Sequence, residues 1–115
     1  MAGVSPMAGS LFENAVAQEI IRYFSNRAQS FELFFWRNRD GEEIDFIVEA
    51  NGERFAIECK LGQPQPSGLA KDRNLDELDI ATGYVATLSA LGREPYQLTN
   101  RWMAGPPERL PIFGA

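Results

Sequence analysis

Near the N-terminus, the apolar and polar positions of the chain follow a helical spacing. Seven apolar side chains recur three or four residues apart between residues 10 and 26: Leu11, Phe12, Ala15, Val16, Ile20, Tyr23 and Phe24. This spacing predicts an amphipathic helix. Ser10 and Glu13 match the S-x-x-E capping box, so the helix is expected to begin at Ser10. The small residues 1–9 are expected to form a flexible tail or linker before a single domain over residues 10–115.

The next part of the chain has the pattern of β-strands. Residues 31–36 are aromatic and apolar, and residues 43–49 and 54–60 alternate between apolar and polar side chains. Asn51-Gly52 lies between the last two segments and is typical of a two-residue hairpin turn, which makes these strands antiparallel. The alternation predicts two sets of side chains that each share a face: Ile44, Phe46 and Val48, and then Phe55, Ile57 and Cys59.

The remainder is less regular. Residues 61–68 contain two prolines and read as a loop, residues 69–79 as a polar helix, and residues 83–88 as another strand. Residues 96–99 fit a short edge strand before a proline-rich end. The order of helix, three strands, helix and strand predicts an α/β fold with a mixed central β-sheet flanked by helices.

The hairpin turn also fixes a register that places two carboxylates together. With Asn51-Gly52 as the loop, Asp45 lies opposite Glu58 and Glu43 lies opposite Lys60. Like charges directly opposite each other destabilise a sheet, whereas a divalent cation between them would reverse the effect. Lys60 shares a face with Glu58 and could orient a water molecule or stabilise phosphate charge. An ordinary solvated strand face is the alternative.

Composition restricts the chemistry. The chain has no histidine, which excludes Ser-His and Cys-His nucleophile pairs. Its single cysteine, Cys59, indicates a reducing compartment, and we expect a cytoplasmic protein without a signal peptide or membrane span. The net charge of −5 opposes strong non-specific binding of nucleic acid, although the arginines could still form a local basic face.

The chemistry-bearing residues resemble a known superfamily. Asp45, followed after twelve residues by Glu58-Cys59-Lys60, resembles the D-x(n)-E-x-K core of PD-(D/E)XK nuclease-like proteins. Residues 9–88, with the segments GSLFENAVAQEII, FFWRNRDGEEIDFIVE and FAIECK, are similar to the uncharacterised, restriction-endonuclease-like domain at the C-terminus of many AAA-type ATPases. One departure is Ile44, which stands where the superfamily name has proline.

The resemblance implies a restriction-endonuclease-like fold with a mixed sheet of four or five strands. It implies that Asp45 and Glu58 ligate Mg²⁺ or Mn²⁺, helped by the backbone carbonyl of Cys59. It also implies that Lys60 positions the attacking water. Glu13 matches a first-helix glutamate that supports the metal or its waters in some relatives, although its capping-box position is a competing explanation.

Four other residues have both a structural and a functional interpretation. Arg37 and Gln63 could contact the substrate, or they could be a surface cation and a plain loop residue. Trp36 fits a core aromatic residue, with a contact to the substrate backbone near the metal as the alternative. Glu19 falls inside the apolar stripe of the first helix, where a position at the helix edge is favoured over a buried one.

Two function classes follow. The first is a metal-dependent nuclease that hydrolyses DNA or RNA. The second is a catalytically inactive, nuclease-like domain that acts as an interaction or regulatory module of an AAA-type ATPase. The chain has no G-x(4)-G-K-[ST] loop and so cannot be the ATPase part itself. A homodimer, formed through an exposed sheet edge or the proline-rich tail, is a third possibility.

Overall fold

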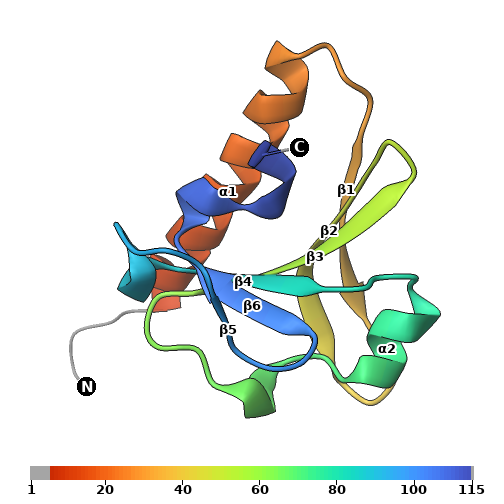
Figure 1. Cartoon of the computed structure of the whole chain (residues 1–115), viewed down its shortest axis with the longest axis vertical. Helices are drawn as coiled ribbons and strands as arrows, with labels where there is room; N and C mark the ends of the chain where they lie inside the picture. Colours follow the sequence, from red (N-terminus) through yellow and green to blue (C-terminus); the bar gives the residue numbers. More distant parts are fainter. Residues whose placement is uncertain (1–5, 115) are drawn as a thin grey trace.

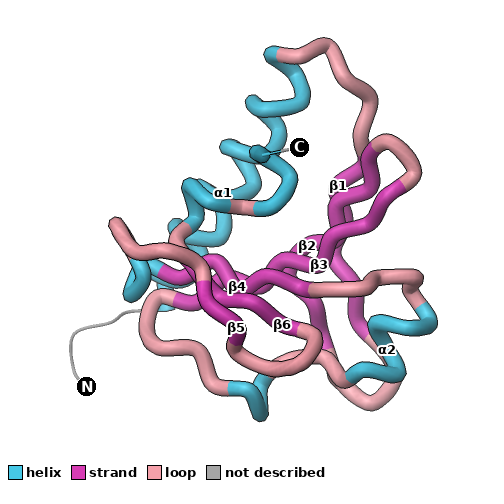
Figure 2. Tube along the Cα trace, in the orientation of Figure 1, coloured by secondary structure: helices cyan, strands magenta, loops and turns pink. Residues whose placement is uncertain are grey.

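The fold is built on a six-stranded sheet in the order β1-β2-β3-β4-β6-β5, seen in the computed structural model of Figures 1 and 2. The structure describes residues 6–114. The strands are β1 (Glu32–Arg37), β2 (Glu43–Ala50), β3 (Glu53–Lys60), β4 (Gly83–Thr87), β5 (Tyr96–Gln97) and β6 (Trp102–Gly105). The helices are α1 (Pro6–Asn26) and α2 (Asp72–Glu77), and there are 3₁₀ turns at Pro66–Gly68, Leu88–Ala90, Pro107–Arg109 and Pro111–Gly114.

Antiparallel and parallel pairings both occur in the sheet, which confirms the expected mixed α/β fold. β1 pairs with β2, β2 with β3, and β5 with β6 in antiparallel fashion. β3 pairs with β4, and β4 with β6, in parallel. The expectation of four or five strands is wrong because β6 enters the sheet between β4 and β5. Three of its four residues are buried, so its sequence, WMAG, does not alternate.

Helix α1 begins at Pro6, so the expected start at Ser10 is wrong. Proline suits a first helical position because its missing N–H would have no partner within the helix. Ser10 and Glu13 therefore lie inside the helix and do not form a capping box, and residues 6–9 of the expected tail are helical. The rest of that tail, residues 1–5, lies outside the described residues. No helix within residues 6–114 combines the length and the apolar character needed to cross a membrane.

Apolar side chains pack on both faces of the sheet. Helix α1 and the C-terminal 3₁₀ turns cover one face, where they lie side by side in Figure 1. The buried members of this cluster include Phe12, Val16, Ile20, Phe24, Val48, Ile57, Leu110 and Ile112. The other face is covered by α2 and the loops around it, and its buried members include Ile44, Ile47, Leu75, Ile80, Val85 and Trp102. We call these the α1-side and α2-side clusters.

The hairpin turn between β2 and β3 is as the sequence predicts. Asn51 and Gly52 have φ angles of 54° and 78°, the left-handed values that a type I′ turn requires at both central residues. The pairing register runs as expected from Ala50 opposite Glu53 to Phe46 opposite Ile57. The turn therefore fixes which residues of the two strands face each other near it.

A β-bulge in β2 resets its alternation farther from the turn. Between Phe34 and Trp36, β1 advances by two residues while β2 advances by three. The extra residue turns the side chains that follow it to the other face. Ile44 consequently packs in the α2-side cluster, whereas Phe46 and Val48 pack in the α1-side cluster. The expectation that Ile44, Phe46 and Val48 share a face is therefore wrong, while Phe55, Ile57 and Cys59 do share the α1 side.

The close contact between β4 and β6 yields a prediction about stability. Gly83 lies opposite Trp102, and a Cβ atom at residue 83 would lie 2.5 Å from two ring atoms of that buried indole. We expect Gly83→Ala to lower the free energy of unfolding by roughly 1–3 kcal/mol, because the ring has to move out of a packed position. Urea denaturation measures this change.

Gly9→Ala is the matched control. Gly9 lies inside α1, and no atom would come within 4 Å of an added Cβ. Alanine at this position should raise the free energy of unfolding by roughly 0.5–1 kcal/mol, because glycine is the poorer helix former. No change in the Gly9 variant would argue against a helix that begins at Pro6.

Candidate functional site

The sheet opens into a fork where β2 and β3 part. The two strands pair from the hairpin turn only as far as Phe46 and Ile57. Beyond this point β2 stays paired with β1 through Ile44 and Glu43, and β3 stays paired with β4 through residues 58–60. We call residues 43–45 and 58–60 the fork. The prediction of a continuous ladder that pairs residue 45 with 58 and residue 43 with 60 is therefore wrong, because the bulge takes β2 out of register.

Asp45 and Glu58 nevertheless lie close together in the fork, because the side chain of each accepts a hydrogen bond from the backbone of the other strand. The Asp45 N–H donates a hydrogen bond of 2.8 Å to Oε1 of Glu58. The Cys59 N–H donates a hydrogen bond of 2.9 Å to Oδ2 of Asp45. The two carboxylates thus accept from amide groups that the interrupted ladder leaves without a strand partner. The second oxygen of each carboxylate makes no hydrogen bond to any residue in the described part of the chain.

Burial and the charges of neighbouring carboxylates make these acids hard to ionise. Glu58 is only 5% exposed, and burial, together with the negative charge of Asp45, raises its pKa to about 8. Burial also raises the pKa of Asp45, although the hydrogen bond from Cys59 and the charge of Lys60 act against this shift. The pKa of Glu13 on α1 is raised by burial and then by the charges of Asp45 and Glu43. The surroundings therefore disfavour negative charge on these three acids.

A pocket of about 390 Å³ lies over the fork. It is lined by Gly41, Glu42, Glu43, Asp45, Glu58, Lys60 and residues 67–71. One wall is anchored by a hydrogen bond of 3.1 Å from the Trp102 indole N–H to the Ala70 carbonyl. The two walls are joined by a hydrogen bond of 2.7 Å from the Asn74 side-chain amide to Oε1 of Glu42. The pocket is therefore a braced feature of the fold.

The structure brings together three of the four expected catalytic residues. Asp45, Glu58 and Lys60 line the pocket. Glu13 does not line it, but its carboxylate is close enough to interact electrostatically with Asp45 and Lys60. Because Glu13 lies inside α1, the capping-box explanation of this residue is wrong, and the expected supporting role near the site stays a prediction.

The other expected residues lie at or beyond the edge of the site. Arg37 is exposed and pairs with Glu43 of the fork at 2.5 Å. Gln63 is exposed in the loop after β3 and does not line the pocket. The Cys59 side chain packs in the α1-side cluster as expected, and burial raises the pKa of its thiol. Cys59 contacts the site through its backbone N–H group, which donates to the Asp45 carboxylate, and not through its side chain.

Two structural interpretations from the sequence are confirmed. The Glu19 side chain is 59% exposed and forms an ion pair with Arg22, so it lies at the helix edge. Trp36 is partly buried against the α2-side cluster. Neither residue lines the pocket over the fork.

Lys71 is a pocket residue that the sequence did not reveal. It lies in the wall formed by residues 67–71 and is exposed. No motif marks it, because ten residues, 61–70, separate it from Lys60. The one available signal was its residue type, since these two are the only lysines in the chain.

The donor set suits a hard divalent cation with few protein ligands. Among residues 6–114 no group of three or more Asp, Glu, Cys or His side chains is arranged to hold a metal ion. Mg²⁺ is often bound by only one or two carboxylates and keeps several waters. Asp45 and Glu58 offer such a pair, with one oxygen each outside the hydrogen bonds of the fork. The expected Mg²⁺ or Mn²⁺ ligands therefore fit, and the metal stays a prediction.

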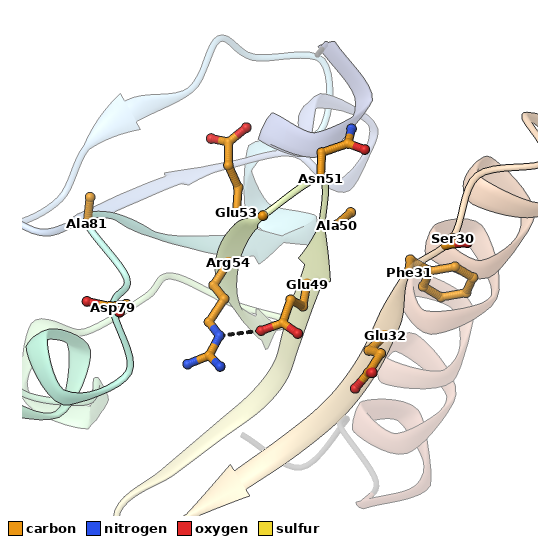
Figure 3. Close-up of a pocket in the computed structure, with 11 residues that line it drawn as sticks. Ser30, Phe31, Glu32, Glu49, Ala50, Asn51, Glu53, Arg54, Asp79 and Ala81 are labelled. Carbon is orange, nitrogen blue, oxygen red and sulfur yellow. Dashed lines mark hydrogen bonds and ion pairs between the residues drawn. The ribbon is translucent and has the colours of Figure 1, made fainter.

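A larger depression of about 680 Å³ lies at the opposite end of the β2–β3 hairpin, as Figure 3 shows. Its side chains include Glu32, Glu49, Glu53 and Asp79. Its single cation, Arg54, is paired with Glu49 at 2.5 Å and donates to the Leu78 carbonyl. None of the catalytic, metal-binding or substrate-binding residues expected from the sequence lines this depression, so the smaller pocket over the fork is the candidate site.

The raised pKa of Glu58 predicts how stability changes with pH. The folded protein binds the Glu58 proton more tightly than the unfolded chain, whose ordinary pKa is near 4.5. The stabilisation is therefore complete below about pH 4.5 and is lost as the pH rises through about 8. Glu58→Gln keeps the hydrogen bond from the Asp45 N–H without a charge. At pH 8, with a chelator present, we expect this variant to be more stable than the parent by roughly 1–3 kcal/mol.

Urea denaturation between pH 5 and pH 8.5 measures this difference. The chain has no histidine, so few other groups titrate in this range. The exposed Glu19→Gln is the matched control and should leave the pH dependence unchanged. A Glu58→Gln variant whose stability parallels the parent at every pH would contradict the shifted pKa.

The comparisons with known proteins give a family but no named activity. No curated protein and no solved structure matches the chain. A family model described as a domain of unknown function, DUF4143, matches residues 8–106. The match includes nearly all of α1, all six strands and both lysines of the pocket. This chain belongs to the DUF4143 family of domains of unknown function.

Proposed function

We propose that the protein is a divalent-metal-dependent nuclease with a site of the PD-(D/E)XK kind. The observation that carries this proposal is the fork, where two half-buried or buried carboxylates and a lysine line one pocket at a break in the sheet. The resemblance of the same residues to the D-x(n)-E-x-K core supports it independently of the geometry.

Each residue has a role in this proposal. Asp45 and Glu58 would hold Mg²⁺ or Mn²⁺, helped by the backbone carbonyl of Cys59. The cation supplies charge neutralisation and lowers the pKa of bound water. Lys60 orients the water that attacks phosphorus. Hydrolysis adds the elements of water across one P–O bond and leaves a phosphate monoester and a hydroxyl group.

The charge of the pocket supports a metal ion rather than a direct contact with a polyanion. Four carboxylates line it, from Glu42, Glu43, Asp45 and Glu58, against two lysines. Glu43 is paired with Arg37 and Glu42 with Arg73, whereas Asp45 and Glu58 have no ion pair within residues 6–114, so a divalent cation would meet the two unpaired carboxylates. Burial raises the pKa values of both acids, and the charge of Asp45 adds to the shift of Glu58; a bound cation would oppose both effects.

A second function is favoured by a different surface. Strand β1 is an edge strand, and its outer side has no partner among residues 6–114. Phe34 and Phe35 are exposed on it, the latter by 73%. Exposed apolar edge strands are ready sites for pairing with another chain. This surface supports the alternative of an inactive nuclease-like module that binds an AAA-type ATPase or a second copy of itself.

Metal titration and cleavage assays test the proposed nuclease. We expect Mn²⁺ and Mg²⁺ to bind the parent protein in calorimetric titration, and Asp45→Asn to weaken this binding by at least about tenfold, because a charged ligand is lost. Lys60→Ala should keep the metal affinity but lower the cleavage rate of labelled DNA or RNA by on the order of 100-fold.

Asp40→Asn is the matched control for Asp45→Asn. Asp40 is an exposed aspartate in the turn before β2 and does not line the pocket. The control should leave both metal binding and cleavage unchanged. A parent protein that binds no metal at millimolar concentration and cleaves no substrate would overturn the nuclease proposal. Metal binding without cleavage would favour the inactive module.

A further inference from the structure

Both lysines of the protein line the same pocket. Of its eleven cationic side chains nine are arginines, and the two lysines are Lys60 and Lys71. Lys60 belongs to β3 and Lys71 to the wall that precedes α2. They therefore reach the pocket over the fork from two separate segments of the chain.

The two lysines differ from most of the arginines in having no ion pair. Six of the nine arginines form ion pairs with carboxylates: Arg22, Arg37, Arg54, Arg73, Arg101 and Arg109. Within the described residues neither Lys60 nor Lys71 has a carboxylate oxygen within 4 Å. Neither ammonium group is therefore held in an ion pair of this kind, although Lys60 acts on Asp45 and Glu58, and Lys71 on Glu42, over a longer distance.

The backbone of Lys71 is held firmly although its side chain is exposed. Its carbonyl accepts hydrogen bonds of 3.0 Å and 3.2 Å from the N–H groups of Asn74 and Leu75. The preceding residue, Ala70, is buried, and its carbonyl accepts from the indole of Trp102. A long, unpaired side chain on a fixed backbone can adapt to a ligand without moving the wall.

The opposite wall shows why a second cation is needed in this pocket. Hydrogen bonds from Asn74 and Asn38, and more weakly the charges of Lys71 and Arg73, lower the pKa of Glu42. Glu42 therefore stays ionised and adds to the negative charge of the pocket. A phosphate that enters the pocket meets these carboxylates, and Lys71 is the cation that the lining offers outside the D-x(n)-E-x-K core.

We propose that Lys71 is a substrate-binding residue that contacts the non-bridging oxygens of a substrate phosphate, from a different segment of the pocket lining than Lys60. This inference rests on the nuclease function proposed above and adds to it a phosphate-binding residue outside the D-x(n)-E-x-K core. An ammonium group has three donors on a flexible stem, which suits a phosphate whose orientation varies. A contact of this kind carries no sequence information, so Lys71 strengthens the binding of every sequence alike.

The salt dependence of binding tests the role of Lys71. We measure the anisotropy of a fluorescein-labelled oligothymidylate over a series of NaCl concentrations with Mg²⁺ present. The Lys60→Ala background limits cleavage during the measurement. Adding Lys71→Ala should weaken binding by roughly tenfold and lower the slope of log K against log[salt] by about 0.7, the loss of one phosphate contact. Lys71→Arg should restore the slope.

Arg93→Ala is the matched control, because Arg93 is an exposed cation that has no ion pair within the described residues and does not line the pocket. It should leave the slope unchanged. In the parent background Lys71→Ala should raise KM with little change in kcat, and Mg²⁺ affinity by calorimetry should stay the same, since Lys71 is not a metal ligand.

Three other results would overturn the inference in distinguishable ways. An unchanged slope and KM in Lys71→Ala, with the parent protein still cleaving, would reject Lys71 and leave the nuclease function standing. A parent protein that neither binds metal nor cleaves would remove the function itself and the inference with it. Loss of Mg²⁺ binding or of folding stability in Lys71→Ala would assign the residue a structural role instead.

Discussion

Two hydrogen bonds between carboxylates and backbone amides hold the fork, and the site depends on them. Where β2 leaves β3, backbone N–H groups lose the ladder partners they would have in a regular sheet, and an unsatisfied buried amide costs roughly 1–3 kcal/mol. Asp45 and Glu58 each accept from an amide of the other strand. The side chains therefore replace the missing ladder, and the strands can diverge without leaving these amides unpaired. The pocket occupies the opening that results.

The two hydrogen bonds of the fork do not by themselves explain why residues 45 and 58 are acids. Asparagine and glutamine offer a carbonyl oxygen that accepts the same hydrogen bonds without charge. Asp45 and Glu58 instead place two carboxyl groups in a largely buried position; burial raises the pKa values of both, and the charge of Asp45 raises that of Glu58 further. Unfavourable charge retained at a break in a sheet is typical of a site that binds something. A divalent cation is the simplest ligand that would turn this repulsion into attraction.

Local signals in the sequence predicted the hairpin well, and non-local features escaped it. Asn51-Gly52 set the turn and the register near it, because the φ angles of two residues decide that geometry. The bulge could not be predicted from the sequence, because residues 43–49 alternate between apolar and polar side chains as a regular strand would. Asp45 and Glu58 still met, as predicted, but through a fork and not through a ladder. The start of α1 was placed too late because S-x-x-E also fits a helix interior.

Lys71 was also missed because its place in the pocket depends on non-local contacts. Its place in the pocket lining depends on the packing of Trp102 and the contact between Asn74 and Glu42, neither of which a local pattern contains. A net charge of −5 opposes a polyanion from a distance, and the pocket itself has more carboxylates than lysines. Under the proposed function the cation therefore binds before the phosphate, since only the loaded pocket no longer repels it. An acidic protein can then act on nucleic acid, provided that its contact is confined to a few phosphates around this pocket.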